Sequence, residues 1–308
     1  MTTPRVGLLG CGRWGRNILR DLVACGCQVV VADPFPAARQ DAVALGAIAA
    51  LPAWDGRAVD GLVIATPTAT HALALEPFLA GATPVFVEKP LCADPGHARR
   101  IVREARCPLA VMEKWRYHPA IVRLAAIARG AELGAVIGLR TRRLQGAHAH
   151  GDVDALWTLA PHDLAIAREV LGAVPPLAAS SREGGAAGAG VTALFAGDGR
   201  PWFALEVSAQ RSRAERAVAL VCAGGSAWFH DAHPDALRIR AGDEERVEAL
   251  AGEPPLLAEI RAFVAWIAGG PAPKGALAEA VETVELIAAL HEPRGHAPTA
   301  DRSRSWPA

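Results

Sequence analysis

The first third of the chain alternates short, continuous apolar runs with helical stretches, and this alternation restricts the fold more than any other feature. The apolar runs are VGLLG (6–10), QVVVAD (28–33), GLVIATP (61–67) and PVFVEKP (84–90). Strands that are buried on both faces have such runs of Val, Leu and Ile, and their alternation with helices implies a parallel sheet with crossover helices. We therefore predict a doubly wound parallel α/β domain.

From about residue 120 the pattern changes to longer, strand-like segments of alternating polarity. These segments are AVIGLRTRRLQG (135–146), GVTALFAG (190–197), WFALEVSAQ (202–210), RAVALVCAG (216–224) and ALRIRA (236–241). Their spacing and glycine-rich turns such as GGAAGAG (184–190) suggest an antiparallel sheet. Apolar residues at intervals of three and four predict helices over 259–270 and 277–290. We expect two domains, residues 1–120 and an α+β domain over residues 121–308.

The charge balance and the cysteine pattern argue against several kinds of partner. Lys plus Arg equals Asp plus Glu, 32 each, so no global field attracts nucleic acid or an anionic membrane. The six cysteines show no CxxC pair, which indicates reduced thiols in a cytoplasmic protein. The N-terminus lacks a signal-peptide pattern, and the longest nearly apolar run, residues 42–54, is too short for a bilayer span.

A glycine motif follows the first apolar run. Gly10, Gly12 and Gly15 form GxGxxG directly before a helical stretch. A tight turn, a close approach of the backbone to a pyrophosphate and a helix N-terminus pointing at it require glycines at this spacing. We predict a Rossmann dinucleotide site here, with Arg13 and Trp14 of the same loop among its contacts; a glycine turn without a ligand is the alternative.

An acidic residue indicates which dinucleotide is bound. Asp33 ends the second apolar run, eighteen residues after Gly15. A carboxylate at this place accepts hydrogen bonds from the adenosine ribose and repels a 2'-phosphate, so NAD is favoured over NADP. Arg39 could reach the same region and bind that phosphate, or it could lie on a solvated helix face.

Two further motifs carry a family resemblance. ATPTATH (65–71) and VFVEKP (85–90), together with GLLGCGRWG (7–15), resemble the glucose/fructose oxidoreductase and inositol dehydrogenase family, Gfo/Idh/MocA. The segment around PHDL (161–164) and the helix over 258–270 extend the resemblance over nearly the whole chain. It implies an N-terminal Rossmann domain, a C-terminal domain with an open, mainly antiparallel sheet for substrate binding and oligomerisation, and a nicotinamide between them.

The resemblance also implies roles for single residues. Thr66, Pro67 and His71 would lie along the cofactor, and Glu88 would lie near the nicotinamide ribose. Lys89 would point at the substrate, and His162 would be the catalytic acid/base. Oxidation of a secondary alcohol needs such a pair, because a neutral histidine accepts the hydroxyl proton and an ammonium stabilises the developing alkoxide.

His162 is expected near the start of a helix. Thr158 is a plausible N-cap and Pro161 would lie in the first turn, so the helix N-terminus would keep His162 neutral. The family often has an aspartate where this chain has Thr158. Asp154 and Asp163 are the nearest carboxylates that could replace it. The change could mean a modest loss of base strength, a different substrate or lost activity, and we favour a different substrate.

Other residues are candidates for the pocket, and each has a structural alternative. The segment MEKWRYHP (112–119) offers Lys114, Trp115 and Tyr117 as substrate contacts, and Trp157 and Thr158 are further candidates; a buried aromatic cluster is the alternative. Strand alternation places Arg140 and Arg142 on one face, where they could hold a phosphate or carboxylate or face solvent. His148 and His150 alone are a weak metal signal, so we predict no metal.

These expectations combine into one leading hypothesis and two alternatives. The leading one is an NAD-dependent oxidoreductase acting on a small carbohydrate-like substrate: a sugar, sugar derivative, nucleotide sugar or cyclitol. The second retains NAD and uses transient oxidation for elimination, epimerisation or glycoside cleavage. The third is an NAD-binding protein without catalysis. An open sheet with an uncovered face also predicts a homodimer or homotetramer.

Overall fold

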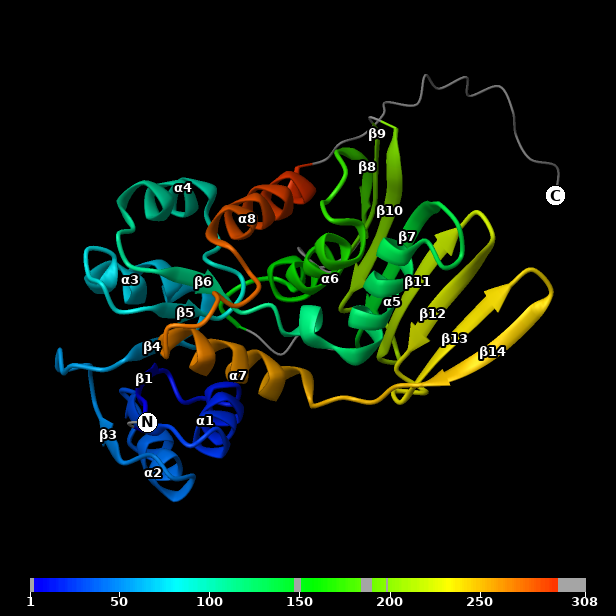
Figure 1. Cartoon of the computed structure of the whole chain (residues 1–308). Helices are drawn as coiled ribbons and strands as arrows, with labels where there is room; N and C mark the ends of the chain where they lie inside the picture. Colours follow the sequence, from blue (N-terminus) through cyan, green and yellow to red (C-terminus); the bar gives the residue numbers. More distant parts are fainter. Residues whose placement is uncertain (1–2, 147–150, 184–189, 198, 293–308) are drawn as a thin grey trace.

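The computed structural model of the chain describes residues 3–146, 151–183, 190–197 and 199–292 (Figure 1). Two β-sheets with helices packed against them make up this part of the chain. None of its helices has the length and apolar character needed to cross a membrane. GGAAGAG, apart from Gly190, and both His148 and His150 fall outside the described residues.

The first sheet has six parallel strands in the order β3-β2-β1-β4-β5-β6. Its strands are β1 (Arg5–Leu9), β2 (Gln28–Ala32), β3 (Ala49–Leu51), β4 (Gly61–Ile64), β5 (Val85–Val87) and β6 (Leu109–Val111). The helices between them are α1 (Gly15–Ala24), α2 (Pro36–Ala44), α3 (His71–Leu75) and α4 (Pro95–Glu104). The predicted doubly wound Rossmann domain is confirmed.

The second sheet has eight strands in the order β14-β13-β12-β11-β7-β10-β9-β8, and all neighbours are antiparallel except β7 and β10. Its strands are β7 (Val136–Leu144), β8 (Leu177–Arg182), β9 (Gly190–Gly197), β10 (Arg200–Ser208), β11 (Glu215–Cys222), β12 (Gly225–His230), β13 (Ala236–Ala241) and β14 (Glu244–Ala249). The mainly antiparallel sheet is therefore confirmed. The sequence analysis did not indicate β8, β12 or β14; β8 is rich in Ala and Ser, and β14 is rich in charged residues.

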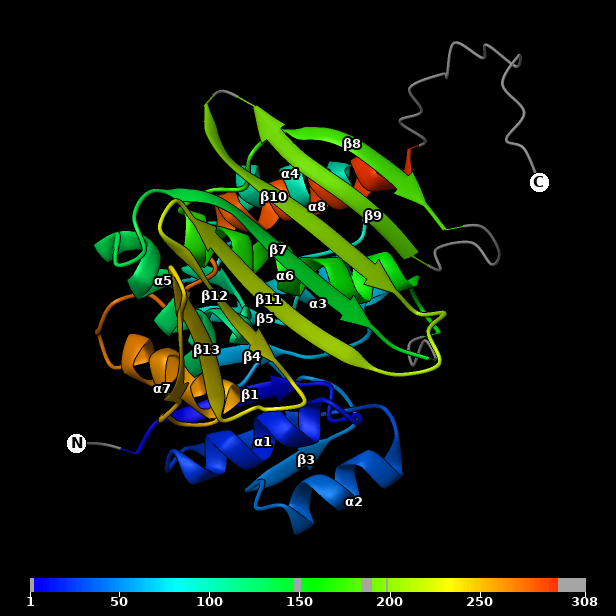
Figure 2. The same cartoon turned by 90° about the vertical axis from the view of Figure 1, so that its right-hand side faces the viewer.

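One face of the second sheet is covered and the other is open. Helices α5 (Pro119–Gly130) and α6 (Ala155–Leu171) pack on the inner face, where Phe195, Phe203 and Phe229 are buried. Figure 2 shows the outer face with no helix drawn on it. Side chains alternate between the faces of a strand, so the outer face carries the partly buried residues of each strand, many of them small.

The two C-terminal helices return to the first sheet (Figure 1). Helix α7 (Pro255–Ile267) stacks Phe263 on Phe86 of β5, with ring centres 5.3 Å apart. Helix α8 (Leu277–His291) buries Val284 in the core that lies under β4 and β5. Both predicted helices are present, and they complete the core of the first sheet. The division at residue 120 stays a prediction.

Candidate active site

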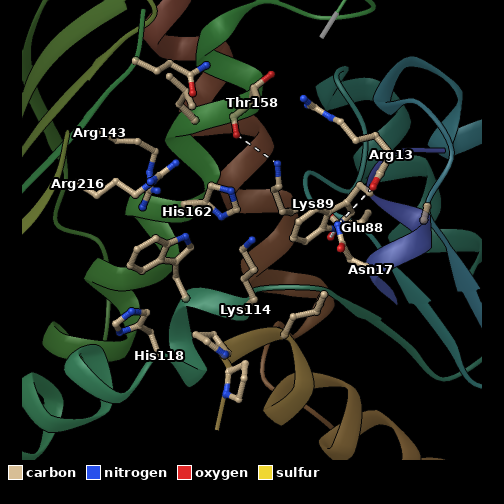
Figure 3. A pocket seen from close by; sticks show the side chains of 18 of the residues that line it. Arg13, Asn17, Glu88, Lys89, Lys114, His118, Arg143, Thr158, His162 and Arg216 are labelled. Atoms are coloured by element: carbon tan, nitrogen blue, oxygen red, sulfur yellow. Dashed lines mark hydrogen bonds between the residues drawn. The ribbon is translucent and has the colours of Figure 1, made fainter. Parts of the chain in front are cut away.

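The carboxyl ends of the parallel strands form one edge of a cavity of about 810 Å³. Ligands of open α/β sheets bind at this edge. The first sheet contributes the loop after β1, the Thr66–Pro67 turn after β4, Glu88 and Lys89 after β5, and Lys114 after β6. The opposite wall comes from α6, β7, β11 and β12, so the cavity lies between the two sheets (Figure 3).

The glycine loop has the geometry that a pyrophosphate requires. Gly10 has a φ of 88°, and a Cβ there would lie 2.6 Å from the carbonyl oxygen of Ala65. A Cβ at Gly15 would overlap the carbonyl oxygen of Gly10. A Cβ at Gly12 would meet nothing within 4 Å. Gly10 and Gly15 are therefore needed by the turn itself, whereas Gly12 leaves open space before the N-terminus of α1, where a phosphate group fits.

Asp33 follows β2 and is almost completely buried beside this loop. Its carboxylate accepts hydrogen bonds from the backbone N–H groups of Cys11 (2.8 Å) and Phe35 (2.9 Å). Each oxygen keeps a further lone pair for ribose hydroxyls. Arg39 donates to the carbonyl oxygens of Asp33 and Pro34, both at 2.8 Å, so it lies beside the ribose position rather than on a solvated face.

Three segments that follow strands of the first sheet meet at one side of the cavity. They contribute Trp14 after β1, Glu88 after β5 and Lys114 after β6. The indole N–H of Trp14 donates to the buried Glu88 carboxylate. The Lys114 ammonium lies 3.9 Å from the centre of the Trp14 ring, a cation–π contact. Burial lowers the pKa of Lys114 to about 8. These contacts fix the wall of the cavity next to the glycine loop.

His71 is buried below the Thr66–Pro67 turn. Its ring nitrogens lie 2.9 Å from the Thr66 carbonyl oxygen and 2.8 Å from that of Pro90. Burial lowers its pKa, so the neutral ring donates to one of these carbonyls. The imidazole thus connects the turn after β4 to the loop after β5, in which the Lys89–Pro90 peptide bond is cis. A direct contact of His71 with a cofactor stays a prediction.

The predicted start of the His162 helix is wrong. Helix α6 begins at Ala155, and its N-cap is Asp154, whose carboxylate accepts from the backbone N–H groups of Leu156 and Trp157. Pro161 therefore lies inside the helix. Because a proline has no N–H to donate and its ring crowds the preceding turn, it perturbs the hydrogen bonding of α6 directly before His162.

Lys89 and His162 meet on the pocket face of α6. Thr158 and His162 are four residues apart, so they lie on the same side of the helix. The Lys89 ammonium donates to the Thr158 carbonyl oxygen at 3.2 Å (Figure 3). The structure therefore brings together the lysine and the histidine that the sequence singled out from segments more than seventy residues apart.

Both groups have lowered pKa values. Burial lowers the pKa of His162 well below its usual 6.5, and the positive charges of Lys89, Arg143, Lys114 and Arg216 lower it further. Burial likewise lowers the pKa of Lys89, with Glu88 acting in the opposite direction. The expected neutral histidine agrees with this direction, but the cause is desolvation and neighbouring cations rather than a helix N-terminus.

Neither candidate carboxylate pairs with His162. Asp163 binds Arg143 at 2.6 Å, with both side chains buried. Asp154 caps α6 and binds His291 at 2.6 Å. Thr158 donates its hydroxyl to the Asp154 carbonyl oxygen. In the part of the chain that the structure describes, no residue supplies the negative partner that the family often places here.

The segment after β6 forms the 3₁₀ helix η3 (Lys114–Tyr117), which faces two ways. Lys114 and Trp115 line the cavity. Tyr117 does not line it, because its hydroxyl accepts from the Lys274 backbone N–H at 2.8 Å on the other side; its prediction as a substrate contact is wrong. Arg116 also points away, to Glu113, Glu169 and Glu279.

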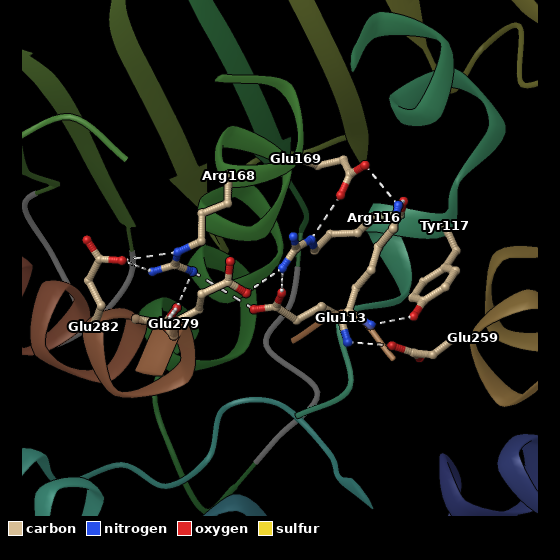
Figure 4. Close-up of polar contacts among 10 residues, drawn as sticks. Glu113, Arg116, Tyr117, Arg168, Glu169, Glu259, Glu279 and Glu282 are labelled. Carbon is tan, nitrogen blue, oxygen red and sulfur yellow. Dashed lines mark hydrogen bonds and ion pairs between the residues drawn. The ribbon is translucent and has the colours of Figure 1, made fainter. Parts of the chain in front are cut away.

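A polar network fixes η3 from behind (Figure 4). Arg116 is its centre, and Arg168 of α6 bonds Glu282 and Thr283 of α8 beside it. Glu259 of α7, fully buried, accepts from the Glu113 backbone N–H, and burial raises its pKa well above the usual range. The network joins α6, α7 and α8 to η3 and so holds Lys114 and Trp115 in the wall.

Two other predicted contacts lie elsewhere. Trp157 stacks on His291, with ring centres 5.6 Å apart, and packs against the hydrophobic cores, so the core alternative is correct. Arg142 points to the outer face of the second sheet, where Glu206 (2.9 Å) and Glu215 (2.6 Å) neutralise it. Arg140 lies on the same face of β7 and is exposed. Neither arginine lines the cavity.

The sequence patterns missed several residues that do line the cavity. They are Asn17, His118, Arg143, Gln145, Arg216 and Phe229. Strand alternation could have pointed to Arg143, because it follows directly on Arg142 and therefore lies on the opposite face of the strand. His118 stacks on Trp115 with ring centres 4.9 Å apart, and burial lowers its pKa to about 4.

The fold and the cavity together define a two-sheet, Rossmann-type dinucleotide-binding protein. The sequence model described as "Oxidoreductase family, NAD-binding Rossmann fold" (GFO_IDH_MocA) matches residues 4–108. The match covers the Rossmann domain, and for this part of the chain it confirms the resemblance drawn from the motifs. The description of this family names NAD as the ligand of its Rossmann fold.

Named relatives match part of the chain, and a solved structure has the same fold. The chain is 33% identical to an inositol 2-dehydrogenase of Rhizobium meliloti over 44% of the chain and 43% of the relative. It is 29% identical to a UDP-N-acetylglucosamine 3-dehydrogenase of Acidithiobacillus ferrooxidans over 57% and 56%. The matched part is thus about half the length of these relatives or less. An oxidoreductase from Agrobacterium radiobacter, solved with NAD+, L-tartaric acid and magnesium, has the same fold, with a TM-score of 0.81, 18% identity and coverage of 94% and 95%.

Proposed function

We propose that the protein is an NAD-dependent oxidoreductase that interconverts a secondary alcohol and a ketone of a sugar-like substrate. One observation carries the proposal: Arg13 and Trp14 of the glycine loop line the same cavity as Lys89 and His162. A cavity of about 810 Å³ is within the usual range for a ligand site. The residues present therefore fit both a dinucleotide and a small substrate.

The side chains divide the chemistry between them. A bound nicotinamide would accept the hydride from the carbinol carbon. His162 is neutral and accepts the hydroxyl proton as the C=O bond forms, because its lowered pKa keeps a ring nitrogen free. Lys89, held by the Thr158 carbonyl, directs its ammonium at the developing negative charge on the oxygen. Trp14 and Glu88 fix the cofactor side of the cavity.

Several supports point to a polyhydroxylated substrate. The relatives named above act on inositol and on the sugar of a UDP-sugar, as their names state. Trp115 presents a large aromatic side chain in the cavity wall. We assign the substrate to sugars, sugar derivatives, nucleotide sugars or cyclitols. Because this chain has Thr158 where the family often has an aspartate, we infer that its substrate differs from those of family members with the aspartate.

The test is a turnover assay. The purified protein is mixed with NAD and a panel of cyclitols, sugars and nucleotide sugars, and absorbance of reduced nicotinamide is recorded. Net NADH formation supports the proposal. Conversion of a substrate without net NADH favours the retained-cofactor reaction instead, and cofactor binding without any turnover favours the non-catalytic protein.

We also propose that the protein is a cytoplasmic homo-oligomer that uses the open face of the second sheet. On this face the Trp202 ring lies over Gly138, where a Cβ would overlap it, and Leu194 is 42% exposed. Such a flat, partly apolar face suits a second copy of the sheet. Light scattering should give a dimer or tetramer, and Leu194→Glu should shift it towards the monomer. The six cysteines, all free, suit a reducing compartment.

A further inference from the structure

The substrate side of the cavity holds more positive charge than the proposed reaction uses. Lys89, Lys114, Arg143 and Arg216 line it, and all four act on His162. Alcohol oxidation as proposed needs one of these cations. Buried or half-buried charges of one sign are unfavourable together unless an opposite charge joins them.

Two of these cations are placed opposite each other. Arg143 on β7 and Arg216 on β11 are direct register partners in the antiparallel pair. Like charges in this position destabilise a sheet. Figure 3 shows both side chains reaching into the cavity on one side of His162, with Lys89 on the other side. The geometry thus separates the reacting end of the cavity from a second, cationic end.

The two guanidinium groups differ in how they are held. Arg143 is buried, binds Asp163 through Nε at 2.6 Å, and lies 4.5 Å over the centre of the Trp115 ring. Arg216 is 45% exposed, and its contact with Asp231 is a long ion pair of 3.5 Å. Within the described ranges, Nη1 of Arg143 and Nε and Nη2 of Arg216 have no hydrogen-bond acceptor. Arg143, which is held in place, and Arg216, which is more exposed, therefore both present free N–H donors to the cavity.

We infer that the substrate carries an anionic group, a carboxylate or a phosphate, which Arg143 and Arg216 bind while the reacting hydroxyl lies between Lys89 and His162. Forked N–H donors match the oxygens of both groups. An anion between the two arginines also offsets the repulsion that their pairing with Asp163 and Asp231 leaves, which a neutral sugar does not. This inference rests on the proposed function, because the proposed function places the reaction at the end of the cavity that holds Lys89 and His162.

The experiment compares matched neutral and anionic sugars. Binding to the NADH-saturated protein is measured by calorimetry for a hexose, its uronate and its 6-phosphate, each in the gluco, galacto and manno configurations. We expect one anionic form to bind about 10- to 100-fold more tightly than its neutral counterpart, the range for charge-assisted hydrogen bonds. If the uronate binds most tightly, the charged group is a carboxylate; if the 6-phosphate binds most tightly, it is a phosphate.

Two variants provide the control. Arg216→Gln should reduce the binding of the anionic sugar to the level of the neutral one. Arg142→Gln removes a neighbouring arginine on the outer face and should leave the preference unchanged. The inference is overturned if no anionic sugar binds more tightly than its neutral counterpart, or if Arg216→Gln weakens both forms equally.

The outcomes separate this inference from the proposed function. Selective anion binding that depends on Arg216, with no NADH formed from any substrate, supports the anion site and refutes the oxidoreductase. NADH formation from neutral sugars that Arg216→Gln leaves unchanged supports the oxidoreductase and refutes the anion site.

Discussion

Replacing Gly10 and Gly12 by alanine, one at a time, should separate folding from cofactor binding within a single loop. At Gly10 the φ of 88° is unfavourable for alanine, by about 1–2 kcal/mol. The new Cβ would also lie 2.6 Å from the Ala65 carbonyl oxygen and 2.8 Å from the Thr66 nitrogen, both backbone atoms. We expect Gly10→Ala to lose at least about 2 kcal/mol of unfolding free energy, a decrease in Tm of roughly 4 °C or more.

Gly12→Ala should behave in the opposite way. Its Cβ meets no protein atom within 4 Å, so the unfolding free energy should change by less than about 0.5 kcal/mol. The same methyl group occupies the space in which the pyrophosphate would approach the backbone, so NADH should bind at least about tenfold more weakly, a loss of about 1.4 kcal/mol.

Thermal unfolding of both variants without cofactor, together with calorimetric titration of NADH, tests this pair. Wild-type NADH affinity in Gly12→Ala would refute the placement of the pyrophosphate at this loop. Wild-type Tm in Gly10→Ala would refute the argument from the turn geometry.

Three further predictions concern the site and the stability of α6. His162→Asn and Lys89→Met should each reduce kcat by about 10²- to 10⁴-fold while NADH affinity stays unchanged, and full turnover in both would remove them from the mechanism. Asp33→Ala should lose the preference for NAD, seen as a kcat/KM with NADP that approaches that with NAD; an unchanged ratio would contradict the role of the carboxylate. The hydrogen bond to Asp154 raises the pKa of His291, whereas that of Asp154 is lowered because its hydrogen bonds outweigh burial. The pair therefore stabilises the folded state most between about pH 4 and 6.5. Its contribution to the unfolding free energy decreases as pH rises through the His291 pKa and as pH falls through the Asp154 pKa. His291→Asn should cost about 1 kcal/mol in this window and less at pH 9, and an equal loss at both pH values would speak against the ion pair.

Activity should also respond to pH through Lys114. Its pKa of about 8 means that it loses its charge as pH rises through this value. If an anionic substrate is bound, KM should increase above pH 8, and Lys114→Met should remove that increase. His162 stays neutral down to well below pH 6.5, so kcat should show no loss on the acid side near 6.5.

Local patterns were sufficient for the cofactor half of the site. The glycine motif, Asp33 and the residues after β4 and β5 all follow directly on strands, and the ends of parallel strands meet at one edge whatever the rest of the chain does. The order of strands and motifs along the chain is therefore enough to place these residues together. The role of each residue towards cofactor or substrate stays a prediction.

The substrate half depended on which face of each element is buried. Strand alternation along RTRR places Arg140 and Arg142 on one face of the strand and Arg143 on the other. It does not show which of the two faces points to the helices and the cavity. Similarly, Trp115 and Tyr117 are two residues apart in a short 3₁₀ helix, and only the network around Arg116 decides that Trp115 faces the cavity.

The sequence by itself determined that His162 lies on a helix opposite an EKP lysine and that it should be neutral. The tertiary structure decided why. His162 lies inside α6 rather than at its start, and its neutrality follows from burial beside Lys89, Lys114, Arg143 and Arg216, which come from four separate segments of the chain. Electrostatic potential sums over neighbours in space, and a sequence pattern reports only neighbours along the chain.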